Sequence, residues 1–321
     1  MKTLRLGTRR SPLALWQTRQ VAAALRRAGA PDPELVTITT DGDRLSAAPR
    51  AEAEPLPAGG GKRLFVKAIE DALLGGRIDL AVHSAKDLPA VIPAGLRIEA
   101  VLPRADPRDA LAAPATATVP AGGAAAWVAR AGPGARVGTS SLRRAAQLRR
   151  AFPDIEVVPV RGNVGTRLRR LDEGGCDLLV LAVAGLVRLG LSERISSPLA
   201  AQVCVPAPGQ GIVAAECRIG DAAAEGLLER IRNREAAQAL GAERALVTAL
   251  GADCNVPLGA LATADGDRLS LRCVVASPDG GRLLGHIVRG RLDDAAGVGR
   301  RAADLLLADG AAALLAAAGA T

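Results

Sequence analysis

The chain has 321 residues, enough for two or three domains that each bury a core of their own. Hydrophobic residues make up 49% of the chain and the mean hydropathy is +0.19, so the composition excludes an intrinsically disordered protein. The net charge is +8, and all but four of the 41 basic residues are arginines. Arginine binds carboxylate and phosphate groups through two parallel hydrogen bonds, and the charge therefore predicts an anionic partner.

Aromatic residues are nearly absent, with two Trp, two Phe and no Tyr. Proteins that bind single strands or RNA usually stack bases on aromatic side chains, so the composition argues against a nucleic-acid partner. Five cysteines form no C-x-x-C pair, and their odd number argues against a disulfide framework, which favours a reducing, cytoplasmic compartment. The two histidines, His83 and His286, lie at no metal-ligand spacing to a cysteine, so we expect no metal site.

The N-terminal sequence favours a strand followed by a helix. Residues 3–7 are strand-like, Ser11 can cap a helix, and Pro12 suits its first position, so we expect a helix that reaches Gly29. No apolar signal segment precedes the strand, and proline and glycine interrupt the uncharged run 110–129, so we expect neither export nor a membrane span. Arg9 falls between strand end and helix start, where backbone N–H groups favour an anion, although a solvated arginine explains it equally well.

Residues 34–40 predict a second strand, and residues 44–61 a long loop of the kind that often forms a lid. The loop ends in three glycines and Lys62. A nucleotide phosphate loop would require Ser or Thr next, and Arg63 stands there instead. A helix marked by Phe65, Ile69 and Leu73 then follows.

Residues 78–89 pass from an apolar strand into polar groups at its carboxyl end. Strands of open α/β sheets carry their chemistry at this end. Asp87 can hold a cationic intermediate, and Lys86 can keep that carboxylate ionised or bind an anion. A polar strand end that only caps the next turn is the alternative, and the residues alone leave both open.

A second α/β unit is predicted to begin at residues 104–109. Strand 137–138 leads through hydroxyl residues into a helix that opens with Arg143 and Arg144, where the helix dipole disfavours cations. Strand 155–160 leads in the same way to Arg161 and Arg167, and Arg188 follows strand 176–183. We therefore expect a negative ligand at these junctions, in preference to a solvated face.

The rest of the chain indicates a return and a third unit. Residues 206–211 look like a crossing between domains, and residues 212–217 like a strand that rejoins the first sheet. A single helix is expected from Asp221 to Leu250, then a tight loop with Cys254 at its centre, then strands 269–276 and 282–291. A thiol in such a loop is accessible and can form a covalent bond, although an unreactive loop cysteine explains it too.

Nine motifs, in order along nearly the whole chain, resemble the porphobilinogen deaminase (hydroxymethylbilane synthase) family. They are GTRRSPLALWQ at 7–17, GGKRLFVK at 60–67, DLAVHSAKDLP at 79–89, DPRDA at 106–110, VGTSSLRR at 137–144, RGNVGTRL at 161–168, LAVAGLVRLG at 181–190, PAPGQG at 206–211 and CNVPLG at 254–259.

The resemblance implies two periplasmic-binding-protein-like α/β domains and a small C-terminal α+β domain. Together with the predicted transitions at residues 104–109 and 206–211, it gives three domains. The first α/β domain comprises residues 1–104 and 212–229, the second residues 105–211, and the C-terminal domain residues 230–321. It also implies an enzyme that joins four porphobilinogen molecules head to tail with loss of ammonia, on one covalent dipyrromethane primer, and releases hydroxymethylbilane by hydrolysis. The acidic substrate and growing oligopyrrole would be the anionic partners, and no metal, nucleic acid or membrane is implied for this monomeric enzyme.

The same resemblance implies roles for individual residues. Asp87 matches the catalytic aspartate and Cys254 the cofactor-attachment point. Cofactor contacts are implied for Ser11, Ser84, Lys86, Thr139, Ser140, Ser141, Arg143, Arg144 and Arg188, and substrate contacts for Arg9, Lys62, Phe65, Arg161, Arg167 and Gln210. Three features depart from the usual pattern: Ala252-Asp253 stand before Cys254 where Gly-Gly is common, Arg63 follows Lys62, and Ala58 stands where some members carry lysine.

Two functions of other classes remain open. An anion-binding module without catalysis explains the arginines and the two α/β units but gives Asp87 and Cys254 no purpose. A nucleic-acid binder explains the charge alone and would show a steep dependence on salt.

Overall fold

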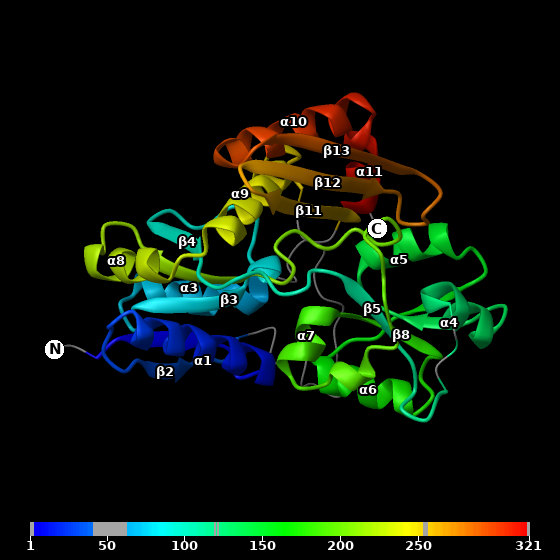
Figure 1. Cartoon of the computed structure of the whole chain (residues 1–321), viewed down its shortest axis with the longest axis horizontal. Coiled ribbons are helices and arrows are strands. Elements are labelled where there is room, and N and C mark those ends of the chain that lie inside the picture. Colours follow the sequence, from blue (N-terminus) through cyan, green and yellow to red (C-terminus); the bar gives the residue numbers. More distant parts are fainter. Residues whose placement is uncertain (1–2, 41–62, 119, 121, 253–255, 320–321) are drawn as a thin grey trace.

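A computed structural model describes residues 3–40, 63–118, 120, 122–252 and 256–319, with the backbone alone for residues 63–65, 100 and 319. Its strands and helices alternate along most of the chain (Figure 1). The strands are β1 Arg5–Thr8, β2 Glu34–Thr37, β3 Leu80–Ser84, β4 Leu96–Ala100, β5 Asp109–Ala112, β6 Arg136–Gly138, β7 Glu156–Val158, β8 Leu178–Ala182, β9 Ser197–Pro198, β10 Val213–Arg218, β11 Leu258–Asp265, β12 Arg268–Ala276 and β13 Leu283–Arg291. The helices are α1 Pro12–Arg27, α3 Arg63–Leu74, α4 Gly123–Ala131, α5 Leu142–Ala151, α6 Val164–Asp172, α7 Val183–Arg188, α8 Ala222–Ile231, α9 Arg234–Ala249, α10 Ala295–Ala308 and α11 Ala311–Gly319, with short 3-10 turns η1 Ala85–Asp87, η2 Ser192–Arg194 and η3 Leu292–Asp294.

The first sheet has the strand order β2-β1-β3-β10-β4. Strands β1, β2 and β3 run parallel, and β10, which comes from far along the chain, pairs antiparallel with β3 and β4. Helices α1 and α8 cover one face through an aliphatic cluster around Val21, Leu25 and Leu228, and α3 covers the other through Ile69 and Leu73. The predicted return of residues 212–217 to the first sheet is confirmed.

The second sheet has the order β7-β6-β8-β5-β9, with β6, β7 and β8 parallel and β5 antiparallel to β8. Helices α4 and α5 pack on one face around Trp127 and Leu148, and α6 and α7 pack on the other around Leu171 and Leu186. Both sheets therefore share one plan, in which an antiparallel strand follows a crossing from the other sheet. The predicted fold class, two periplasmic-binding-protein-like α/β units and a small C-terminal unit, is confirmed.

The C-terminal unit differs from its prediction in two details. The helix expected from Asp221 to Leu250 is two helices, because the chain turns at Arg232 and Asn233 and the Asn233 side chain caps α9 by accepting from the Ala236 N–H at 2.9 Å. The sheet has three strands in the order β11-β12-β13 instead of two. Strand β11 was missed because its alanine and glycine residues give little of the alternation that marks a strand.

The core of this unit is aliphatic. Leu269, Leu271, Cys273 and Val275 alternate along β12 and are at most 1% exposed, in one cluster with residues of α9 and α10. Side chains two apart in a strand share a face, so this face of the sheet is closed by the two helices. Figure 1 shows α9 and α10 lying along the three strands.

The two crossings between the α/β units meet at a buried carboxylate of α9. Glu243 pairs with Arg104 of the first crossing at 2.6 Å and accepts from the Gly209 N–H of the second crossing at 2.5 Å. Arg104 also donates to the Gln210 carbonyl at 2.9 Å, so the C-terminal unit holds both crossings together. The domain boundaries expected at residues 104/105, 211/212 and 229/230 stay predictions.

None of the helices described is both long and apolar enough to cross a bilayer. Among the same residues, no three His, Cys, Asp or Glu side chains come close enough together to hold a metal ion.

Candidate active site

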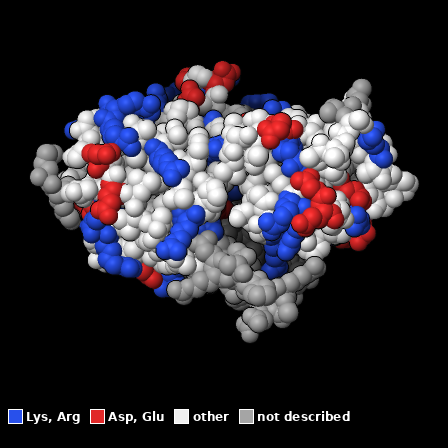
Figure 2. Space-filling model, turned by 90° about the horizontal axis from the view of Figure 1, so that it is seen from below, with Lys and Arg blue, Asp and Glu red and all other residues white. Residues whose placement is uncertain are grey.

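A cavity of about 410 Å³ lies where the three units meet. Its lining comes from η1 of the first unit, from the N-terminus of α5 and from Arg167 of the second, and from α9 and β11 of the third. Figure 2 shows the molecule from below, with basic side chains on both sides of a hollow near the middle. Among the described residues that line the cavity, Asp87 is the one acidic side chain.

Asp87 stands at the boundary of two spaces. It ends η1 directly after β3, and it lines both the large cavity and a smaller one of about 60 Å³. Arg9, Ser11 and Ser84 line the smaller cavity with it. A half-buried carboxylate in this position can face groups of a ligand on either side.

The backbone that carries Asp87 is supported from behind by the second crossing. A Cβ at Gly209, whose φ is +74°, would lie 2.8 Å from the Ala85 carbonyl carbon and 2.9 Å from the Lys86 nitrogen. Only glycine permits both this φ and this approach. The backbone of the PAPGQG motif therefore packs directly against the turn that presents Lys86 and Asp87.

Lys86 reaches the cavity from the same turn. Its Nζ donates to Gln210 Oε1 at 3.2 Å. Burial and the neighbouring Arg144 guanidinium lower the pKa of Lys86 to about 8, although Asp87 and Asp109 act in the opposite direction. Lys86 is therefore an ammonium near neutral pH that a ligand carboxylate would further stabilise.

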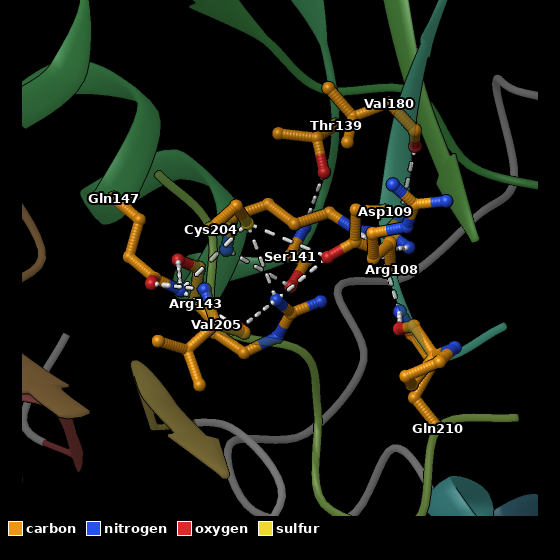
Figure 3. A network of polar contacts seen from close by, with 12 residues as sticks. Arg108, Asp109, Thr139, Ser141, Arg143, Gln147, Val180, Cys204, Val205 and Gln210 are labelled. Carbon is orange, nitrogen blue, oxygen red and sulfur yellow. Dashed lines mark hydrogen bonds and ion pairs between the residues drawn. The ribbon is translucent and has the colours of Figure 1, made fainter. Parts of the chain in front are cut away.

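Asp109 is the centre of a polar network at the second unit's edge of the cavity (Figure 3). Its carboxylate pairs with Arg143 Nη1 at 2.8 Å and Arg144 Nη2 at 2.6 Å, and it accepts from Gln210 Nε2 at 2.8 Å. Burial alone would raise the pKa of Asp109, but the two guanidinium groups more than offset this and hold it well below its usual range. A negative group does lie opposite these arginines, as the helix dipole indicated, and it is a residue of the chain. The ligand that we expected at this junction stays a prediction.

Arg167 and Arg188 lie in a different environment. The Arg167 Nε donates to the Gly162 carbonyl at 2.7 Å, and an Arg188 Nη donates to the Gly211 carbonyl at 2.7 Å. The Arg188 guanidinium also lies 5.5 Å from the centre of the Trp16 ring of α1. Neither arginine pairs with a carboxylate in the described part of the chain, and burial lowers the pKa of each to about 10.

The structure brings together most of the predicted site residues. The large cavity is lined by Lys86, Asp87, Ser140, Ser141, Arg143, Arg144, Arg167 and Gln210, and the small one by Arg9, Ser11, Ser84 and Asp87. Thr139 and Arg188 are buried beside these spaces without lining them, and Arg161 is exposed at the start of the turn before α6. Lys62, Cys254 and the side chain of Phe65 lie outside the described residues.

Two residues of the site were missed from the sequence. Arg244 of α9 lines the cavity and donates to the Pro89 and Ala90 carbonyls at 2.9 and 2.8 Å, which ties the C-terminal unit to the chain after Asp87. A charged residue inside a helix gives no signal of such a contact. Asp109 belongs to the DPRDA motif, and that motif was the available signal for it.

Comparison with known proteins gives the family. A sequence model described as "Porphobilinogen deaminase, dipyromethane cofactor binding domain" matches residues 4–226, and one described as "Porphobilinogen deaminase, C-terminal domain" matches residues 237–308. The chain belongs to the porphobilinogen deaminase family. The resemblance drawn from the motifs is therefore confirmed.

Curated members of the porphobilinogen deaminase family match over the whole chain. The porphobilinogen deaminase of Xanthomonas oryzae pv. oryzae (strain PXO99A) is 48% identical over 320 residues, covering 99% of this chain and all of the relative. That of Xanthomonas euvesicatoria pv. vesicatoria (strain 85-10) is 47% identical over 319 residues, covering 98% of this chain and 99% of the relative. Among solved structures, the periplasmic aliphatic sulphonate binding protein of Escherichia coli matches with a TM-score of 0.40 and 14% identity, covering 77% of this chain and 70% of that one.

The cavity suits the cofactor after which the family's larger domain is named. A dipyrromethane carries carboxylate side chains and pyrrole N–H groups. Arg167 offers a half-buried cation without a carboxylate partner among the described residues, and Asp87 offers a carboxylate that can accept from an N–H group. Val256 and Leu258, which follow the CNVPLG cysteine, line the same cavity as Asp87.

Proposed function

We propose that this chain is a hydroxymethylbilane synthase, which joins four porphobilinogen molecules head to tail and releases the linear product by hydrolysis. The observation that carries the proposal is the cavity in which Asp87, the one acidic lining residue described, faces Lys86, Arg167 and the arginines of α5. Each substrate brings an acetate and a propionate, so the growing chain is a polyanion that these cations can bind.

Asp87 is the catalytic residue of the proposal. Loss of ammonia leaves a cationic pyrrole with an electrophilic methylene carbon. The free ring carbon of the acceptor pyrrole attacks this methylene carbon. The acceptor ring carbon then loses its proton, which restores the aromatic ring. A fixed carboxylate stabilises both cationic stages through the pyrrole N–H groups and the charge. Its position between two spaces lets it face both reacting rings.

The remaining assignments follow the same proposal. Dipyrromethane supplies the first acceptor ring, and Cys254 holds it through a thioether. Support comes from the other cysteines: all four are buried, and burial raises the pKa of Cys204 to about 12 and of Cys217 and Cys273 to about 11, which makes them poor nucleophiles. The pyrroles and their carboxylates are proposed to be held by residues that line the two cavities: Arg9, Ser11, Ser84, Lys86, Ser140, Ser141, Arg143, Arg144, Arg167 and Gln210. Further contacts are proposed for Lys62, Phe65, Thr139, Arg161 and Arg188.

We also propose a cytoplasmic monomer without nucleic-acid or membrane partners. The four buried cysteines are free thiols, as expected in a reducing compartment.

Intact mass spectrometry of the purified protein tests the assignment. The mass should exceed the sequence mass by two linked pyrrole units, Cys254→Ala should abolish the increment, and Cys273→Ala, in the same C-terminal unit, should keep it. An active wild type with no increment would refute the proposal. Calorimetric binding of a simple oxyanion, with no porphobilinogen consumed in an Ehrlich assay, would instead favour an anion-binding module.

A further inference from the structure

Gln210 connects the Asp109 network to the catalytic turn. Its side-chain amide is 1% exposed. The Nε2 donates to the Pro107 carbonyl at 2.7 Å and to Asp109 Oδ1 at 2.8 Å, and the Oε1 accepts from Lys86 Nζ at 3.2 Å. One amide therefore joins the first crossing, the second unit and the residue next to Asp87.

Asp109 determines which way this amide points. Asp109 is fully buried and its pKa is held low, so it is a carboxylate and can only accept hydrogen bonds. The Pro107 carbonyl is also an acceptor only. The NH2 end of Gln210 must face these two oxygens, and its carbonyl end is left for Lys86, which can only donate. A reversed amide would set oxygen against oxygen and nitrogen against ammonium.

We propose that Asp109 is a positioning residue for the condensation, acting through Gln210 to hold the Lys86 ammonium at the cavity wall beside Asp87. The carboxylate that pairs with Arg143 and Arg144 thus also places the cation of the first unit. The role of this cation in the condensation rests on the proposed function, which supplies its ligand. The contact between Gln210 and Lys86 does not depend on that function.

The contact between Gln210 and Lys86 can be tested in the purified protein without substrate. It has four lysines, Lys2, Lys62, Lys67 and Lys86, so each falls in an identifiable peptide. Acetic anhydride acetylates only neutral amines, and the rate of Lys86 labelling against pH, with the 72% exposed Lys67 as internal reference, gives the pKa of Lys86 in the purified protein. In the wild type we expect half-maximal labelling at or above a pH of about 8, because the carboxylates of a bound dipyrromethane would further stabilise the ammonium.

Two variants break the connection at different points. Gln210→Met keeps the length of the side chain but offers no acceptor, so the ammonium is less stabilised and Lys86 should label at lower pH. Asp109→Asn removes a negative charge and frees the amide to reverse, so the labelling midpoint should fall further, by about one pH unit. In an Ehrlich assay, Gln210→Met should lower kcat/KM about tenfold, since Lys86 and Gln210 hold carboxylates of the oligopyrrole in this proposal.

Gln147→Met is the matched control. Gln147 is a buried glutamine beside the same network. Its hydrogen bonds go to Val205, Cys204 and the Arg143 carbonyl, and within the described part of the chain none goes to Lys86 or Asp109. It should cost stability like Gln210→Met and leave the Lys86 midpoint in place. The proposal is overturned if Lys86 labels at the same pH in the wild type and Gln210→Met, or if Gln147→Met moves it equally. A protein without dipyrromethane would refute the proposed function and leave the labelling result valid.

Discussion

Two pairs of arginines lie in or beside the cavity wall, and they are held in opposite ways. Arg143 and Arg144 pair with Asp109 within 2.8 Å, so one carboxylate of the protein offsets one of their two positive charges. Arg167 and Arg188 are also mostly buried, yet each has only a backbone carbonyl as a hydrogen-bond partner among the described residues, with the Trp16 ring beside Arg188.

The difference separates arginines that also support the fold from arginines that no carboxylate of the described chain holds. Burial of a cation costs free energy unless a charge or ligand offsets the loss of water. In the first pair Asp109 supplies part of this offset. The pair also holds the second unit to the chain before the second crossing, because Arg143 donates to the Val205 carbonyl. In the second pair the pKa is lowered by burial, which is the state of a cation that an anionic ligand would stabilise.

The largest expected effect is on stability, from Asp109→Ala. The change leaves two buried guanidinium groups without a counter-charge, and we expect the free energy of unfolding to fall by about 3–5 kcal/mol in urea denaturation. Asp106→Ala is the control, because Asp106 pairs with Arg108 at the surface, where an ion pair contributes about 1 kcal/mol or less. A loss for Asp109→Ala no larger than the control's would remove the contrast between the two arginine pairs.

Arg167→Met should have the opposite profile. Replacing a buried cation that lacks a carboxylate partner by an apolar side chain should leave the unfolding free energy unchanged within about 1 kcal/mol or raise it. The KM for porphobilinogen should rise about 10- to 100-fold, as expected for a lost hydrogen bond between charged groups. Arg169→Met, on the exposed side of the same helix, should change neither quantity. Stability lost with KM unchanged would mean that Arg167 is structural.

A third effect concerns pH and Lys86. The pKa of Lys86 is about 8 in the folded protein, whereas an unfolded lysine has about 10.4, so between these values the unfolded state binds the extra proton. The wild type should therefore gain stability relative to Lys86→Met as pH rises from about 8 to about 10.4. Over the same range its KM should rise, because the neutral amine no longer pairs with a carboxylate. Urea denaturation and the Ehrlich assay at both ends of this range measure the two trends, and Lys67→Met, at an exposed lysine, should follow the wild type in both.

Local features were largely predictable. The caps at Ser11 and Ser141 are present, and Asp87 does follow the carboxyl end of a buried strand. Helix caps and strand ends depend on residues that are neighbours in the sequence, so a pattern of a few positions is enough to predict them. The break before α9 and the strand β11 were missed, because a cap inside a helical pattern and a strand of small residues give weak local signals.

The sequence by itself determined the family, through nine motifs in order, and with it the expected reaction and the importance of Asp87. Only the tertiary structure decided which arginines already have a partner. Arg143 and Arg144 meet a carboxylate from β5, Arg188 meets a tryptophan from α1, and Arg244 reaches the cavity from another unit. Charge pairing depends on distance in space and on burial, and neither can be read from positions that lie tens to hundreds of residues apart in the chain.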